Sequence, residues 1–214
     1  MIYGDIRDYD SLKQAVKDIQ IVFHLAGVVT DWAPQKLFAD VNIHGTEKLC
    51  RASLEQGIER FVYVSINDVF GIRENIVIDE TMSYQNWQEP YPDTKIEASN
   101  IVWEYGKKGL PVTIVYPCWV YGPGDRTLIP LLADAIRKRN LVFWRKNVIV
   151  WPAYVINVID LLMVASHHPR AIGGRILLFM MVCQMFLKIS LLKLLKNWDP
   201  KKYQLIYPTK WRTG

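Results

Sequence analysis

The sequence has few cysteines and no long apolar run. Its 214 residues include three cysteines, Cys50, Cys118 and Cys183, which lie far apart without a C-x-x-C pair. This excludes a disulfide framework and a zinc knuckle, so we expect a cytoplasmic protein with no metal site. The most apolar window, residues 176–187, is shorter than the roughly 20 residues that a membrane-spanning helix needs. The first five residues do not have the character of a secretory signal.

Most of the chain has no net positive charge. The net charge is +5, yet residues 188–214 hold seven basic side chains against one aspartate, which leaves the preceding residues close to neutral. A nucleic-acid-binding protein usually has a basic face on its main domain, so we predict no nucleic-acid partner. The basic segment is most simply a solvated surface helix. Tethering to an anionic membrane is the alternative.

Short apolar runs alternate with longer helical patterns, which predicts an α/β fold with a parallel sheet. Strands are predicted over residues 19–24, 61–65, 111–116, 148–156, 175–181 and 203–207. Helices are predicted just after Asp8 and over residues 34–56, 93–108, 128–139, 158–167 and 187–198. The pattern changes after Gly124. We therefore divide the chain into a sheet domain, residues 1–116, and a smaller substrate lobe, residues 117–214, with an atypical basic end at 176–214.

A glycine-rich phosphate turn is missing. Doubly wound sheets usually begin with a strand, a G-x-G-x-x-G turn and a helix whose start binds pyrophosphate. No such motif occurs here, and residues 4–8 resemble the end of a strand that enters a helix. Either the sheet begins differently, or its first βαβ unit is absent.

Tyr91 and Lys95 form a Y-x-x-x-K motif at the start of a predicted helix. One turn apart, the two side chains face the same way, and a nearby ammonium is expected to lower the pKa of the phenol. The motif alone is weak, because composition predicts roughly one chance match. Tyr9 and Lys13 supply a second match, which we interpret as a helix surface. The position in the chain must decide between them.

Six motifs occur in a fixed order along the chain. They are Asp5, His24-Leu-Ala-Gly27, Asn42-x-x-Gly45-Thr46, Val64 to Gly71, Tyr91 with Lys95, and Tyr116-Pro117 followed by Val120 to Gly124. In this order and spacing, the chain from residue 2 to about 175 resembles the extended short-chain dehydrogenase/reductase superfamily. Its nearest groups are the NAD-dependent epimerase/dehydratases and the hydroxysteroid-dehydrogenase-like proteins.

The resemblance implies a Rossmann-like doubly wound sheet that lacks its N-terminal glycine-rich βαβ unit, and a cofactor that is NAD or NADP. It also implies a small-molecule substrate with a secondary alcohol or ketone, such as a nucleotide sugar or a sterol-like compound. A homodimer is compatible with the sequence. The implied cofactor-binding residues are Asp5 and Ile6 at the adenine, Leu25, Ala26 and Gly27 along the dinucleotide, Tyr91 and Lys95, and Pro117 beside the nicotinamide.

The implied catalytic pair is Tyr91, which moves the proton, and Lys95, which holds the ribose and lowers the pKa of Tyr91. The family places a Ser or Thr five residues before Gly71, where this chain has Ile66. Isoleucine donates no hydrogen bond, so Ser65 is the candidate to replace it, provided that a bulge turns its side chain toward the site. Tyr116 stands where an Arg is usual. The alternative function is that of a truncated, non-catalytic relative, either a fragment or a pseudoenzyme.

Other polar and aromatic residues have simpler interpretations. We expect His24 to be a strand-end residue hydrogen-bonded to the backbone, and His167 and His168 to close a helix, where their charge is favoured. Trp144 and Trp151 fill a core, with stacking on a substrate ring as the alternative.

Overall fold

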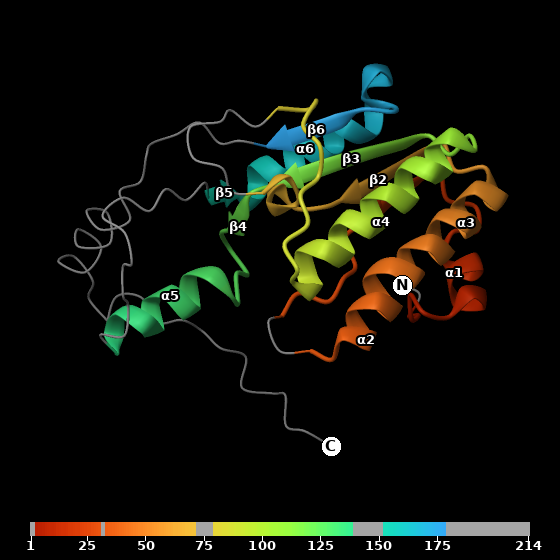
Figure 1. The fold of residues 1–214 in the computed structure, drawn as a ribbon. Coiled ribbons are helices and arrows are strands. Elements are labelled where there is room, and N and C mark those ends of the chain that lie inside the picture. Colours follow the sequence, from red (N-terminus) through yellow and green to blue (C-terminus); the bar gives the residue numbers. More distant parts are fainter. Residues whose placement is uncertain (1–2, 31–32, 72–78, 139–151, 179–214) are drawn as a thin grey trace.

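The computed structural model describes residues 3–30, 33–71, 79–138 and 152–178 (Figure 1). Four parallel strands form the main sheet in the order β1-β2-β3-β6. These strands are β1 (Ile21–His24), β2 (Arg60–Val64), β3 (Val112–Pro117) and β6 (Arg175–Leu178). Two further strands, β4 (Trp119–Tyr121) and β5 (Pro152–Tyr154), pair with each other in parallel.

Helices cover both faces of the main sheet. They are α1 (Tyr9–Ala15), α2 (Gln35–Phe38), α3 (Thr46–Gln56), α4 (Pro90–Lys107), α5 (Leu128–Arg137) and α6 (Val155–His167), with a π-helical segment, Ala39–Gly45, that joins α2 to α3. Figure 1 shows α1, α3 and α4 in front of the sheet and α6 behind it. Helix α5 contacts β4 and lies away from the main sheet (Figure 1).

Strand β2 shows how the sequence builds these two layers. Phe61 and Tyr63 pack into the core beneath α3 and α4, whereas Val62 and Val64 pack against α6. Successive side chains of a strand point to opposite faces, and a parallel strand buried on both faces is apolar throughout. The predicted doubly wound parallel α/β fold is confirmed.

Most predicted elements lie within a few residues of the observed ones, and the differences have local causes. Helix α4 begins at Pro90 rather than at 93, because Pro90 and Pro92 fit a first helical turn, where no backbone donor is lost. The strand predicted over 148–156 is wrong at its end, since Val155 and Ile156 already belong to α6. Trp144, Trp151, the helix at 187–198 and the strand at 203–207 lie outside the described residues.

The main sheet crosses the proposed boundary at residue 117, because β6 pairs with β3 and α6 packs on the same sheet. The division into a sheet domain and a substrate lobe stays a prediction. Within the described ranges, no helix combines the length and apolar character needed to cross a bilayer.

Candidate functional site

Tyr91 and Lys95 lie where the strands of the main sheet end. Parallel strands that are linked through helices bring their carboxyl ends to one edge, and the following helices run back from that edge. Accordingly, Lys95 in the second turn of α4 donates a hydrogen bond of 2.7 Å from Nζ to the carbonyl oxygen of Val64, the last residue of β2. The ring of Tyr91 packs at 6.5 Å from that of Phe38 and is partly exposed. The motif therefore lies at the edge where such sheets bind ligands.

Lys95 is a buried ionisable residue. Its side chain is 6% exposed, and Nζ lies 4.3 Å from the centre of the Tyr63 ring. Removal from water disfavours the charged form and lowers the pKa of Lys95 to about 7. The carbonyl of Val64 and the face of Tyr63 partly compensate for the lost hydration.

Tyr91 does not have the lowered pKa that its motif predicts. Burial, followed by the negative charge of Asp68, raises the pKa of Tyr91 to about 12. The expectation that Lys95 lowers this pKa is therefore wrong for this structure, in which the ammonium is bonded to Val64. Tyr91 is a neutral phenol near pH 7 and is suited to donate a proton or a hydrogen bond.

Ser65 lies in the interior. It is 1% exposed, and its hydroxyl is 3.0 Å from that of Ser99 on α4, which in turn donates to the carbonyl of Lys95. This orientation ties β2 to α4 and does not favour contact with a substrate. The catalytic role assigned to Ser65 stays a prediction.

Tyr116, in the position where an Arg is usual, belongs to the aromatic core. Its hydroxyl lies 2.5 Å from that of Tyr84, and the Tyr84 hydroxyl also accepts a hydrogen bond of 2.9 Å from Trp103 Nε1. Burial raises the pKa of Tyr116. The next residue, Pro117, ends β3 and is buried.

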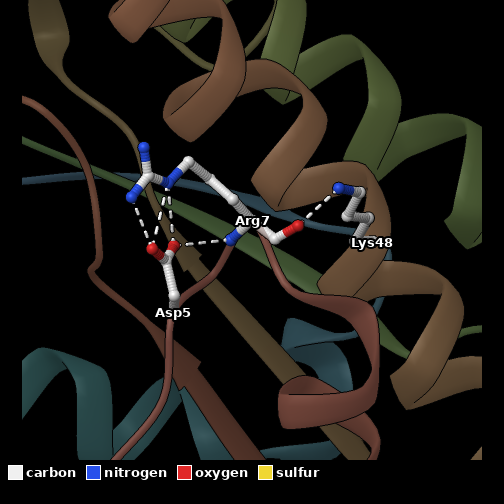
Figure 2. A network of polar contacts seen from close by, with 3 residues as sticks. All are labelled: Asp5, Arg7 and Lys48. Atoms are coloured by element: carbon white, nitrogen blue, oxygen red, sulfur yellow. Dashed lines mark hydrogen bonds and ion pairs between the residues drawn. The ribbon is translucent and has the colours of Figure 1, made fainter.

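The segment before α1 carries an ion pair, shown in Figure 2. The Asp5 carboxylate accepts hydrogen bonds from the backbone N–H of Arg7 at 2.9 Å and from its guanidinium at 2.5–3.0 Å. These bonds lower the pKa of Asp5 to about 2. Lys48 on α3 donates to the carbonyl of Arg7 at 2.5 Å. An adenine group at Asp5 and Ile6 would compete with Arg7, and the adenine-binding role of these two residues stays a prediction.

Asn42 is a buried residue whose contacts the sequence did not indicate. From the π-helical segment, its amide oxygen accepts the N–H of Val28 at 2.8 Å, and its Nδ2 donates to the Thr94 hydroxyl at 3.1 Å. Thr94 donates to the carbonyls of Pro90 and Tyr91. Asn42 therefore fixes the segment after β1 relative to the start of α4.

The residues after β1 fit a dinucleotide in part. Leu25, Ala26 and Gly27 are exposed, so their backbone is open to a ligand. A Cβ atom at Gly27 would lie only 3.2 Å from Asn42 Oδ1, which explains why glycine fits there. The adenine end fits less well, because the Asp5 carboxylate is already bonded to Arg7.

His24 is bonded to a side chain and not to the backbone, which corrects the expectation. Its Nε2 lies 2.8 Å from the Thr46 hydroxyl, and its buried Nδ1 has no hydrogen-bond partner among the described residues. Burial, together with the charge of Lys95, lowers the pKa of His24 to about 3. His24 is thus a neutral core residue.

We expect His24 to destabilise the fold in acid. Between pH 6.5 and 3 the unfolded chain binds a proton at His24 and the folded chain does not, so stability falls as the pH falls. From pH 6 to pH 4 the loss is about 2.5 kcal/mol for this group. Urea unfolding of the wild type and of His24→Gln at pH 6 and pH 4 measures this loss of stability. His44→Gln, which replaces an exposed histidine, is the control and should lose as much stability between pH 6 and pH 4 as the wild type does. A loss of the same size in His24→Gln would contradict the prediction.

Tyr9 and Lys13, the second Y-x-x-x-K pair, lie on the surface as predicted. The Tyr9 hydroxyl donates to Glu55 at 2.5 Å, and Lys13 pairs with Asp10 at 2.7 Å. Helix α6 ends at His167, which confirms that the two histidines close a helix. In the part of the chain that the structure describes, no three His, Cys, Asp or Glu side chains gather as a metal would require.

Comparison with protein families gives a match over residues 1–170 to the 3-beta hydroxysteroid dehydrogenase/isomerase family. A 3 beta-hydroxysteroid dehydrogenase/Delta 5→4-isomerase of Mycobacterium tuberculosis is 33% identical over 181 residues, which are 78% of this chain and 49% of that protein. A 2-alkyl-3-oxoalkanoate reductase of Stenotrophomonas maltophilia is 30% identical over 144 residues, which are 65% of this chain and 44% of that protein. The chain thus spans about half the length of these relatives.

Solved structures show the same fold. A UDP-glucuronic acid 4-epimerase of Bacillus cereus, in complex with NAD, matches 92% of this chain and 65% of its own with a TM-score of 0.78 at 22% identity. A dTDP-glucose 4,6-dehydratase of Streptomyces venezuelae, with NAD bound, matches 90% of this chain and 62% of its own with a TM-score of 0.76 at 22% identity.

Proposed function

The chain belongs to the 3-beta hydroxysteroid dehydrogenase/isomerase family, and from this we propose that it provides the catalytic part of an NAD(P)-dependent dehydrogenase or reductase. The substrate is a secondary alcohol or ketone. The names of the relatives favour a sterol-like or similar apolar compound over a nucleotide sugar. The observation that carries the proposal is the partly exposed, neutral Tyr91 next to the buried Lys95 at the carboxyl edge of the sheet.

In this proposal the chain's own residues orient the substrate and move the proton. Tyr91 donates its phenolic proton to the oxygen of a ketone and becomes a phenolate; in the reverse direction, the phenolate takes up the proton of the alcohol. Lys95 holds the ribose and fixes the start of α4. Leu25, Ala26, Gly27 and Pro117 bind the dinucleotide, which supplies or accepts the hydride when it is bound.

The alternative, a non-catalytic relative, has one specific observation in its favour. Ile66 replaces the hydroxyl that would polarise the substrate oxygen, and Ser65 is turned toward Ser99. Losing one such donor lowers turnover by about 10²-fold or more. A binding protein would retain cofactor affinity and lack turnover.

Titration of the 214-residue chain with NADH and NADPH, followed by tryptophan fluorescence, tests cofactor binding. We expect saturable quenching in the micromolar range, and weaker binding for Lys95→Ala. The exposed Lys107→Ala serves as the control and should bind as wild type does. A folded chain that binds neither nucleotide would contradict the proposal for this chain.

A further inference from the structure

The short sheet formed by β4 and β5 carries aromatic side chains on one of its faces. Trp119 and Tyr121 of β4 share a face, because alternate side chains of a strand point the same way. Tyr154 of β5 pairs with Tyr121 in register, and the centres of the two rings are 5.5 Å apart. We call Trp119, Tyr121 and Tyr154 the aromatic face of this sheet.

The opposite face of the short sheet packs toward α6. Ala153 of β5 is fully buried in a cluster with Val158 and Leu162 of α6. Helix α6 lies behind the main sheet, and α4, whose first turn holds Tyr91, lies in front of it (Figure 1). The aromatic face is therefore turned away from the α6 layer and toward the side of the molecule that holds Tyr91.

The aromatic face is open to a ligand. Trp119 is 48% exposed, and Tyr121 and Tyr154 are partly exposed. Helix α5 contacts β4 and leaves Ile129 and Leu131 largely exposed, so the apolar surface continues onto α5. Exposed apolar patches of this kind are typical of interaction sites and ligand-binding grooves.

The chain connects the aromatic face directly to the candidate site. Pro117, the last residue of β3 and a proposed neighbour of the nicotinamide, precedes Trp119 by two residues. Figure 1 shows the chain passing from the end of β3 through β4 to α5. A Cβ atom at Gly122, just after β4, would lie 3.1 Å from the Tyr154 ring, so the backbone there packs closely against that ring.

We propose that the aromatic face binds the apolar ring system of the substrate while the substrate oxygen is held at Tyr91. The inference rests on the proposed function and deepens it, because it assigns the residues that favour an apolar ring compound over a nucleotide sugar. Ring carbons gain free energy by leaving water and packing on aromatic side chains. The three aromatic side chains carry no positive charge to bind the diphosphate of a nucleotide sugar.

The test is equilibrium dialysis of tritium-labelled dehydroepiandrosterone, a 3β-hydroxysteroid, against the 214-residue chain with NADH present. We expect Trp119→Ala to raise the Kd about 10-fold or more, and Trp119→Phe, which keeps a ring, to recover part of the affinity. Since Trp119 is half exposed, thermal unfolding should change little. Met163→Ala shortens an apolar side chain of α6 that is 49% exposed, and this matched control should bind as the wild type does. Excess UDP-glucose should not displace the steroid.

Three results would overturn the inference. They are a wild type that does not bind the steroid, a Trp119→Ala variant that binds it as tightly as the wild type, and equal losses in Trp119→Ala and Met163→Ala, which would indicate non-specific adsorption. Light scattering adds a check on the competing occupant. A dimer that Trp119→Ala abolishes, with steroid affinity unchanged, would assign the face to a second copy of the chain.

The same variants separate this inference from the proposed function. Oxidation of the steroid with NAD is assayed apart from binding. Steroid binding that depends on Trp119, without any oxidation, would refute the dehydrogenase proposal and leave the role of the aromatic face standing. Oxidation with the same KM in the wild type and in Trp119→Ala would do the reverse.

Discussion

Replacement of Tyr91 by phenylalanine should lower the turnover number by about 10²- to 10⁴-fold, the usual contribution of a positioned acid or base. Phenylalanine keeps the ring that packs against Phe38 but has no proton to exchange with the substrate oxygen. Cofactor affinity and thermal unfolding should change little. Steady-state assays of ketone reduction, with nucleotide affinity measured in parallel, would show a loss in the rate and not in binding.

The chain contains a matched control for this substitution. Tyr9→Phe removes a hydroxyl from the other Y-x-x-x-K pair, whose phenol donates to Glu55 on the helix surface. Its turnover should equal that of the wild type. Turnover retained in Tyr91→Phe would disprove the catalytic assignment, whereas equal losses in both variants would indicate an effect on folding.

The architecture was predictable because it depends on local patterns. The apolar run that forms β2 is flanked by a helix that ends at Gly57, whose positive φ of 68° is typical of a helix C-terminus. The limits of β1, β2 and β3, the doubly wound class and the family resemblance follow from such signals in order along the chain. The π-helical segment around Asn42 was not predicted, because the amide contacts to Val28 and Thr94 form only in the folded protein.

The positions of the site residues were more predictable than their electrostatics. The motif identified Tyr91 and Lys95 and the end of the sheet near which they lie, since helix periodicity sets that geometry. It did not reveal that Lys95 reaches Val64, 31 residues away in sequence, or that Asp68 adds a negative charge beside Tyr91. Burial and long-range partners set these pKa values, and a sequence pattern contains neither.

Lys95 should make the protein more stable in mildly alkaline solution, and this is the largest pH effect that we expect. Its pKa is about 7 in the folded chain, against 10.5 for a lysine surrounded by water, as in the unfolded chain. Between these values the unfolded chain binds a proton at Lys95 and the folded chain does not, so stability rises with pH. From pH 7 to pH 9.5 the gain is about 3 kcal/mol for this group.

Urea unfolding of the wild type and of Lys95→Met at pH 7 and 9.5 measures this gain as a difference between the two proteins. Methionine does not titrate, so the stability of the variant should not rise with pH in this way. The variant also leaves the Val64 carbonyl without its donor, which lowers stability by about 1–3 kcal/mol at both pH values. Lys107→Met removes an exposed lysine paired with Glu104, and its stability should rise between pH 7 and pH 9.5 as much as that of the wild type. A rise of the same size in Lys95→Met would mean that Lys95 is hydrated in solution. Its ammonium would then be free to reach a ribose without first leaving the Val64 carbonyl.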